Sequence, residues 1–296
     1  MGRPTELVRT PFGELESFAG EPITEQLRRY GAHQRSDLAA ARSLLRRGDL
    51  VLDVGAHVGT LALPFAQAIG PSGRVYAFEG SRPTFVVLRA NASRAGEGRV
   101  LPVRTMVSDC DGVLGLVDVR DDSGLTFLTD PGAPGDEVPT TTLDRWIAAE
   151  RPGAAVAFMK ADVEGMELRV LRGAAGIVER DRPVLMLELS ASQLERAGNT
   201  RHELGRWLTA RGYRLYVNVH RRQAVRDEHR LARIPDLRML RLGGGRFALC
   251  ELFAVHSSSS RLPRGALPVP ATLALLAATR ARRYLTSSAS RSRRTG

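Results

Sequence analysis

The chain has 296 residues, of which 43% are hydrophobic, and its formal net charge at pH 7 is +11. Eight arginines of that charge lie between residues 257 and 296, a segment without acidic residues, which leaves +3 for residues 1–256. A domain of this size can bury a full core, and its low charge does not favour nucleic acid as the partner. We expect the basic tail to be disordered, with contact to an acidic partner as the alternative.

No part of the sequence predicts secretion or membrane insertion. Residues 1–20 are mixed and polar. The most apolar late stretch, residues 266–278, is shorter than the roughly 20 residues of a spanning helix and contains Pro268 and Pro270. The two cysteines, Cys110 and Cys250, provide no disulfide framework. We therefore expect a cytoplasmic protein without a transmembrane segment.

After residue 36 the sequence alternates between predicted helices and predicted strands. Apolar residues at helical spacing predict helices at residues 37–47, 60–69, 83–94, 167–179 and 202–211. Apolar and β-branched runs predict strands at residues 50–54, 74–78, 99–107, 154–161, 184–189, 213–219 and 247–255. The pattern predicts one mostly parallel α/β sheet with helices on both faces and an antiparallel last strand.

The expected organisation has three parts. Residues 1–36 are interpreted as an irregular N-terminal cap with a helix near residues 23–29. Residues 37–256 form the main domain, in which short strands near residues 113–119 and 125–128 interrupt the alternation. Residues 257–296 are the basic tail.

An acidic residue lies at the carboxyl end of each of five predicted strands. These residues are Asp53, Glu79, Asp109, Asp162 and Glu188. Ligands of open α/β sheets bind beyond the carboxyl ends of the strands. The five acids therefore predict a row of hydrogen-bond acceptors along the ligand-binding edge of the sheet.

The first of these strands leads into a glycine turn, Asp53-Val-Gly55-Ala-His-Val-Gly59. A dinucleotide turn would need glycine at the positions of His57 and Thr60, so a nicotinamide oxidoreductase is not favoured. An acid directly before the turn is also unsuited to a pyrophosphate. S-adenosylmethionine has no phosphate, and its ribose hydroxyls, its amino groups and its sulfonium suit a site lined by carboxylates. We therefore expect S-adenosylmethionine as the cofactor.

Several motifs together resemble the FkbM family of S-adenosylmethionine-dependent methyltransferases. They are the glycine turn, Phe78-Glu79, Thr142-Leu-Asp144, Lys160-Ala-Asp162-Val-Glu164-Gly-Met-Glu167, and Arg182-Pro183 before Glu188. The resemblance covers residues 30–255 and implies a class I methyltransferase (Rossmann-like) sheet and O-methylation of hydroxyls on polyketides or sugars. Gly80 and Ala161 depart from the family pattern, but neither removes a polar group of the motifs.

The residues expected to bind the cofactor are Asp53, Gly55, Ala56, Gly59, Glu79 and Asp109. The two glycines would leave room for the cofactor beside the backbone. Asp53 would lie near the methionine amino group or its ordered water, or would cap the turn. Glu79 is the expected acceptor for the ribose diol. Asp109 is the candidate for the adenine edge, with a simple turn acid as the alternative.

The catalytic candidates are Lys160, Asp162, Glu164 and His57. Lys160 is the only lysine of the chain, and strand alternation places it on the same face as Asp162, toward the reacting groups or as a structural ion pair. A base drawn from Asp162, Glu164, Glu188 and His57 would take the acceptor's proton, although His57 could instead bond at the start of the helix. No residues have the spacing of metal ligands, and a cation held by Asp162 is the weaker alternative.

The sequence thus predicts an S-adenosylmethionine-dependent O-methyltransferase that acts on a hydroxyl of a small molecule or a saccharide. The alternative function is a binding module of the same fold, which would contact an acidic partner through the basic tail of residues 257–296.

Overall fold

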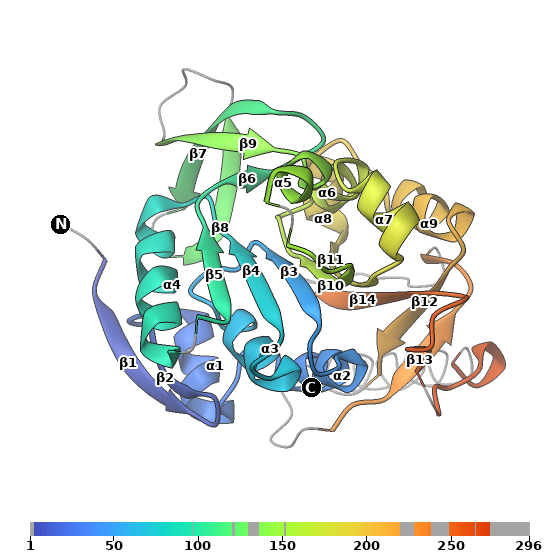
Figure 1. Ribbon diagram of the computed structural model, residues 1–296, viewed down its shortest axis with the longest axis horizontal. Coiled ribbons are helices and arrows are strands. Elements are labelled where there is room, and N and C mark those ends of the chain that lie inside the picture. The colour runs from blue at the N-terminus through green and yellow to red at the C-terminus, as the bar shows by residue number, and fades with distance from the viewer. Residues whose placement is uncertain are drawn as a thin grey trace, which may run out of the picture.

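One eight-stranded sheet organises the chain (Figure 1). The structure is a computed structural model that describes residues 3–96, 98–119, 122–129, 136–150, 152–219, 228–237, 249–263 and 265–272. In spatial order, the strands of this sheet are β13 (Leu231–Ile234), β12 (Tyr213–Asn218), β14 (Leu249–His256), β11 (Val184–Ser190), β10 (Val156–Ala161), β3 (Leu50–Val54), β4 (Arg74–Phe78) and β5 (Val100–Val103).

The direction of the strands confirms the predicted fold class. Strands β5, β4, β3, β10 and β11 pair in parallel. The last strand, β14, inserts antiparallel between β11 and β12. The strand order reverses at β3, which lies between β4 and β10. The carboxyl end of β3 is therefore the switch point at which open α/β sheets bind their ligands.

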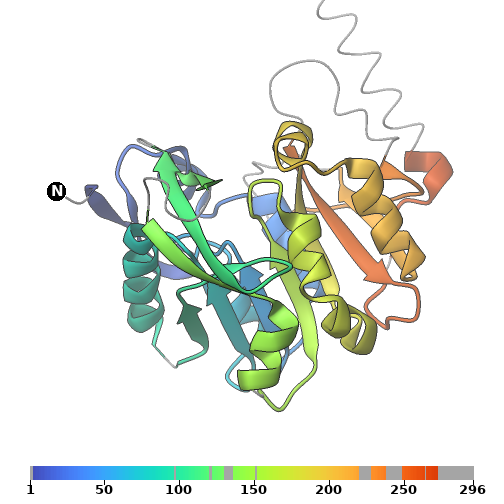
Figure 2. The same cartoon turned by 90° about the horizontal axis from the view of Figure 1, so that it is seen from above.

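Helices cover both faces of the large sheet (Figures 1 and 2). One face carries α2 (Arg35–Leu44), α3 (Ala62–Ile69) and α4 (Arg82–Ala95). The other carries α5 (Leu143–Glu150), α6 (Glu167–Arg172), α7 (Ala175–Asp181), α8 (Ala191–Arg196) and α9 (Arg201–Ala210). Successive side chains along a strand point to opposite faces of the sheet, so Phe158 packs in the core on the α2–α4 side and Met159 in the core on the other side.

The N-terminal region is more regular than the sequence predicts. Strands β1 (Thr5–Thr10) and β2 (Gly13–Phe18) form an antiparallel hairpin, and α1 (Pro22–Tyr30) follows at the position of the predicted helix. Apolar residues of these three elements pack in one cluster with Val58 and Val87. The hairpin therefore lies against α4 and against the turn that follows β3. Its division from the main domain at residue 36 stays a prediction.

A second sheet of four strands confirms the predicted interruption after β5. Its spatial order is β6 (Met106–Val107), β9 (Asp136–Thr141), β7 (Gly112–Val119) and β8 (Asp122–Thr129). The single strand predicted at residues 99–107 is in fact β5 and β6, because the chain leaves the large sheet at residues 104 and 105. The small sheet thus begins at the carboxyl end of β5.

The helix predicted at residues 167–179 is two helices, α6 and α7. Gly173 separates them, and its backbone lies so close to Ser108 that a Cβ atom there would be 2.0 Å from the Ser108 carbonyl oxygen. The close contact ties these helices to the segment that carries Asp109.

The first part of the predicted tail packs against the domain. Arg261 forms a bidentate ion pair with Asp49, with both nitrogen–oxygen distances 2.6 Å, and Leu267 bridges to Ala232 beside β13. The side chain of Thr272 is fully buried. We call residues 257–263 and 265–272 the C-terminal strap; they differ from the predicted disordered tail because this ion pair anchors them. The predicted disorder of residues 273–296 concerns a segment outside the described residues.

None of the helices in the described ranges is long and apolar enough to span a membrane. The cytoplasmic location stays a prediction.

Candidate active site

The turn after β3 is held tightly between β4 and β10. The backbone N–H groups of Gly55 and Ala56 both donate to the carbonyl oxygen of Phe78, at 3.0 and 2.9 Å. Gly55 has a φ of +74°, and a Cβ atom there would lie 1.9 Å from the carbonyl oxygen of Asp162. Only glycine fits this combination of φ and contact. The structure therefore explains Gly55 by the packing of the turn against the end of β10.

Gly59 and Ala56 are also fixed by the protein itself. Gly59 has a φ of +91°, and a Cβ atom there would come within 2.6 Å of the Leu63 side chain. Ala56 is buried. That these residues also border a cofactor stays a prediction.

The carboxylate of Glu79, at the end of β4, is oriented by two backbone groups. Its two oxygens accept hydrogen bonds from the N–H groups of His57, at 3.0 Å, and Ser81, at 2.8 Å. A carboxylate has about four acceptor positions and can accept from several donors at once. The structure thus brings the carboxylate of Glu79 beside the β3 turn.

His57 is a poor candidate for a base in this environment. Its ring lies 6.2 Å from that of Phe18 in the hairpin, and its φ is +52°. Burial, together with the positive charge of Lys160, lowers the pKa of His57 to about 4. Its backbone N–H orients Glu79, so the structure favours the hydrogen-bonding alternative that the sequence left open.

Lys160 is buried at the centre of the site. Its Nζ donates to the carbonyl oxygen of Gly55 at 3.0 Å and lies 3.6 Å from Asp53 and 3.3 Å from Asp162. Burial would lower the pKa of Lys160, but the surrounding carboxylates, chiefly those of Asp162 and Asp53, outweigh burial and raise it. Lys160 is therefore a permanent cation that ties the β3 turn to the end of β10.

Asp53 is fully buried beneath the turn. Neither of its carboxylate oxygens has a hydrogen-bond partner among the described residues, and its charge is balanced by Lys160. Burial raises the pKa of Asp53, and the charge of Lys160 opposes that rise. A direct contact with the methionine amino group would need Asp53 to become exposed, and this role stays a prediction.

The strand registers place further acids on the same face of the sheet as Lys160. Lys160 pairs with Asp53 across β10 and β3, and Glu188 pairs with Glu251 across β11 and β14. Glu188 is two residues beyond Met186, the partner of Lys160 in β11. Strands alternate with a period of two, so these groups share one face. The prediction that Lys160 and Asp162 face the same way is confirmed by their contact.

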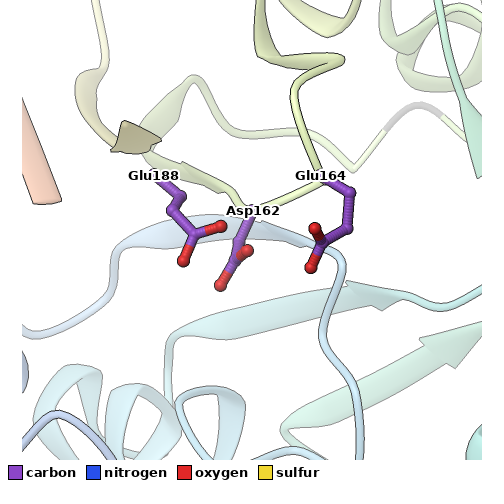
Figure 3. A group of neighbouring side chains, drawn as sticks. All are labelled: Asp162, Glu164 and Glu188. Carbon is purple, nitrogen blue, oxygen red and sulfur yellow. The ribbon is translucent and has the colours of Figure 1, made fainter. Parts of the chain in front are cut away.

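Three carboxylates converge at the carboxyl ends of β10 and β11. The carboxylate oxygens of Asp162, Glu164 and Glu188 lie within 4.8 Å of one another, and Figure 3 shows the three side chains pointing the same way. Such a group could hold a divalent cation, the weaker alternative of the sequence. However, Lys160 already supplies a positive charge 3.3 Å from Asp162.

Glu164 is held in an unusual backbone conformation, with a φ of +54°. The carboxylate of Glu167 accepts hydrogen bonds from the N–H groups of Val163 and Gly165, the two neighbours of Glu164 in the chain, each at 3.2 Å. The side-chain amide of Gln193 donates to the Glu164 carboxylate. A non-glycine residue at positive φ is strained, and such strain is concentrated at functional sites.

The environment of Glu164 makes it a titratable group near neutral pH. Burial, followed by the charge of Asp162, raises the pKa of Glu164 to about 8, although the hydrogen bond from Gln193 lowers it. Gln193 belongs to α8, a short helix that the sequence analysis missed. Six residues without a clear apolar period carry little signal. The sequence signal for this contact was Gly165. A Cβ atom at that position would lie 2.2 Å from the Gln193 carbonyl oxygen, so the glycine marks the close approach of α8.

Asp109, at the start of the small-sheet excursion, is engaged by Arg169 of α6. The guanidinium lies 2.8 Å from its Oδ1, and Ser108 donates to the same oxygen. Burial raises the pKa of Asp109, but the hydrogen bond and the charge of Arg169 outweigh burial and hold that pKa below its ordinary range. Asp109 is therefore ionised and fixed in position, while its contact with adenine stays a prediction.

The comparison with protein families identifies the chain. A family model described as the methyltransferase FkbM domain matches residues 53–215, more than half of the sequence. The chain belongs to the FkbM methyltransferase family. The predicted family and its cofactor, S-adenosylmethionine, are thereby confirmed.

The chain is also similar to individual known proteins. The 31-O-demethyl-FK506 methyltransferase FkbM of Streptomyces tacrolimicus is 34% identical in an alignment of 171 positions that covers 47% of this chain and 63% of that protein. The match thus spans less than two thirds of the relative's length. Among solved structures, the methyltransferase FkbM of Methylobacillus flagellatus KT has 16% identity and a TM-score of 0.42, covering 71% of this chain and 44% of its own. An S-adenosylmethionine-dependent O-methyltransferase of Thermotoga maritima has 14% identity and a TM-score of 0.40, covering 86% and 79%.

Replacing Lys160 by methionine should destabilise this FkbM-family domain by about 3–5 kcal/mol, because Asp53 would be left buried without a cation. Urea denaturation at pH 7 measures the loss. The double variant Lys160→Met with Asp53→Asn should recover part of it, since the uncompensated charge is removed. The control is Arg89→Met on the exposed surface of α4, for which we expect a change below about 0.5 kcal/mol. An unchanged unfolding midpoint for Lys160→Met would contradict the assigned role.

Proposed function

We propose that the protein transfers a methyl group from S-adenosylmethionine to a hydroxyl of a small molecule, either a polyketide-type compound or a saccharide. The observation that carries this proposal is the position of Glu164, whose carboxylate lies beside that of Asp162. Asp162 in turn contacts the β3 turn, because its N–H donates to Val54 at 3.1 Å. A proton acceptor thus lies next to the expected cofactor turn. The name of the Streptomyces tacrolimicus relative, a 31-O-demethyl-FK506 methyltransferase, supports an oxygen acceptor.

The hydrogen-bond acceptors of the site suit S-adenosylmethionine. Carboxylates lie at the strand ends, and the turn after β3 lacks the glycines that a pyrophosphate site requires; Glu79 is oriented beside that turn by two N–H groups. We assign Glu79 to the ribose, Asp109 to the adenine edge, and the turn from Gly55 to Gly59 to the border of the site. When bound, S-adenosylmethionine supplies an electrophilic methyl group on a good leaving group. The protein's main task is then to align the acceptor oxygen with that carbon.

Among the four candidate bases, Glu164 is the best matched to the proton it must accept. The pKa of His57 is lowered to about 4, and Asp162 is engaged by Lys160. Glu188 is only 5% exposed, so an acceptor molecule has little access to its carboxylate. Glu164, with a pKa raised to about 8, is a strong base that is still ionised in part at neutral pH. In the proposed reaction, a carboxylate oxygen of Glu164 would take the acceptor's hydroxyl proton as the bond from the acceptor oxygen to the methyl carbon forms and the methyl–sulfur bond breaks, its electron pair staying on the sulfur.

The alternative function, a binding module that acts through its basic tail, is not favoured by the family match. The methyltransferase proposal can be tested directly with S-adenosylmethionine that carries a deuterated methyl group. We expect mass spectrometry to find the deuterated methyl group on a hydroxyl oxygen of a hydroxylated macrolide or of a neutral saccharide. Transfer only to nitrogen or carbon of the acceptors would contradict an O-methyltransferase.

The pH dependence of the reaction tests the role of Glu164. A base must be ionised to act, so kcat/KM should rise with pH and level off above about 8. Glu164→Gln should lower kcat by about 10²–10⁴-fold. Gln193→Leu removes a hydrogen bond that favours the ionised form, so the rising limb should move to higher pH.

The matched control for Gln193→Leu is Gln67→Leu on α3, which likewise removes one side-chain amide hydrogen bond, to the Phe12 carbonyl oxygen at 3.1 Å. That substitution should leave the profile in place. A rising limb near pH 4 in the wild type would point to His57 instead and would contradict the assignment of Glu164.

A further inference from the structure

A cavity of about 430 Å³ lies away from the candidate active site. It is lined by the end of α2, by the residues before and at the start of β13, and by the C-terminal strap. The strap is anchored here to Asp49, which directly precedes the first residue of β3. The cavity therefore adjoins the amino end of that strand, opposite the edge that carries the Asp162 cluster. None of the candidate catalytic or cofactor residues lines it.

The walls of the cavity are fixed by specific contacts. Arg261 of the strap binds Asp49 through both guanidinium nitrogens and also donates to the carbonyl oxygen of Leu44 at 2.9 Å. Arg46 donates to the carbonyl oxygen of Ser260 at 2.9 Å. These bonds join the strap to the end of α2 on one side of the cavity. The hollow is thus a built feature of the fold.

The lining combines an apolar floor with positive charge. Leu44 and Leu231 are buried at the floor and belong to the core on the α2–α4 side, against which Leu262 of the strap also packs. No acidic side chain of the described residues lines the cavity, whereas Arg46 and Arg230 do. Neither arginine pairs with a carboxylate in the described part of the chain. An anionic group would find uncompensated charge here.

His229, which directly precedes Arg230 in the chain, also lines the cavity. The volume falls within the range of about 300–1,000 Å³ that is usual for small-molecule sites.

We propose that this cavity is a binding site for a small organic anion, in which a short apolar body rests on the leucine floor and its carboxylate, phosphate or sulfonate meets Arg230 and Arg46. The site is separate from methyl transfer and holds whether or not the proposed acceptor is correct. A purely inorganic anion would leave the apolar floor unused, and a neutral apolar molecule would leave the arginines uncompensated.

The test uses the fluorescence of 8-anilinonaphthalene-1-sulfonate, an apolar sulfonate, titrated into the full chain. Arg230→Glu should weaken binding at least about tenfold, because it replaces attraction by repulsion at the rim. Ser43→Phe should also weaken it by filling the cavity without a change of charge. Arg89→Glu, an exposed substitution on α4, serves as the matched control and should leave the affinity within about twofold.

Competition separates the possible sources of the anion and the possible sites. Octanoate should displace the probe, and octyl phosphate should do so at least as well, whereas inorganic phosphate alone should not. Saturating S-adenosylmethionine should leave the probe bound. Displacement by S-adenosylmethionine, equal displacement by inorganic phosphate, or unchanged affinity in both Arg230→Glu and Ser43→Phe would overturn the proposal. Failure of methyl transfer would not affect these results.

Discussion

The site depends on one buried ion cluster in which a single lysine balances several carboxylates. Lys160 bonds to the Gly55 carbonyl oxygen and contacts Asp53 and Asp162, so it joins the ends of two neighbouring parallel strands. Charges of this kind are costly to bury and are tolerated only when they are paired. The cluster therefore specifies how the β3 turn sits against β10. Asp109 and Glu79 are fixed by their own partners, Arg169 for Asp109 and the N–H groups of His57 and Ser81 for Glu79.

The turn and the acids around it follow from this constraint. Gly55 must be glycine because Asp162 approaches its backbone, and Glu79 is aimed at the same place by the N–H of His57. On the far side of Asp162, Glu167 and Gln193 hold Glu164 in a strained conformation, and burial raises the pKa of its carboxyl. One end of the site thus carries the carboxylates that suit a cationic cofactor without phosphate. The other end carries Glu164, the proposed base.

Much of this could be predicted because it depends on local rules. The period of two along a strand places Lys160 and Asp162 on one face, and an acid at each strand end follows from the α/β alternation. Long-range contacts were beyond these rules. Gln193 reaches Glu164 from a helix of only six residues, and the capture of Arg261 by Asp49 joins residues 212 positions apart. The role of His57 also needed the structure, because its backbone contact with Glu79 has no sequence signature.

The most direct test is a crystal structure of the protein with S-adenosylhomocysteine, the demethylated product. The account predicts that the ligand lies at the switch point at the carboxyl end of β3, with its ribose hydroxyls on Glu79 and its sulfur on the side of Glu164. It also predicts that Lys160 keeps its contacts with Gly55 and Asp162. A ligand bound elsewhere on the molecule, or ribose hydroxyls that do not contact Glu79, would contradict it.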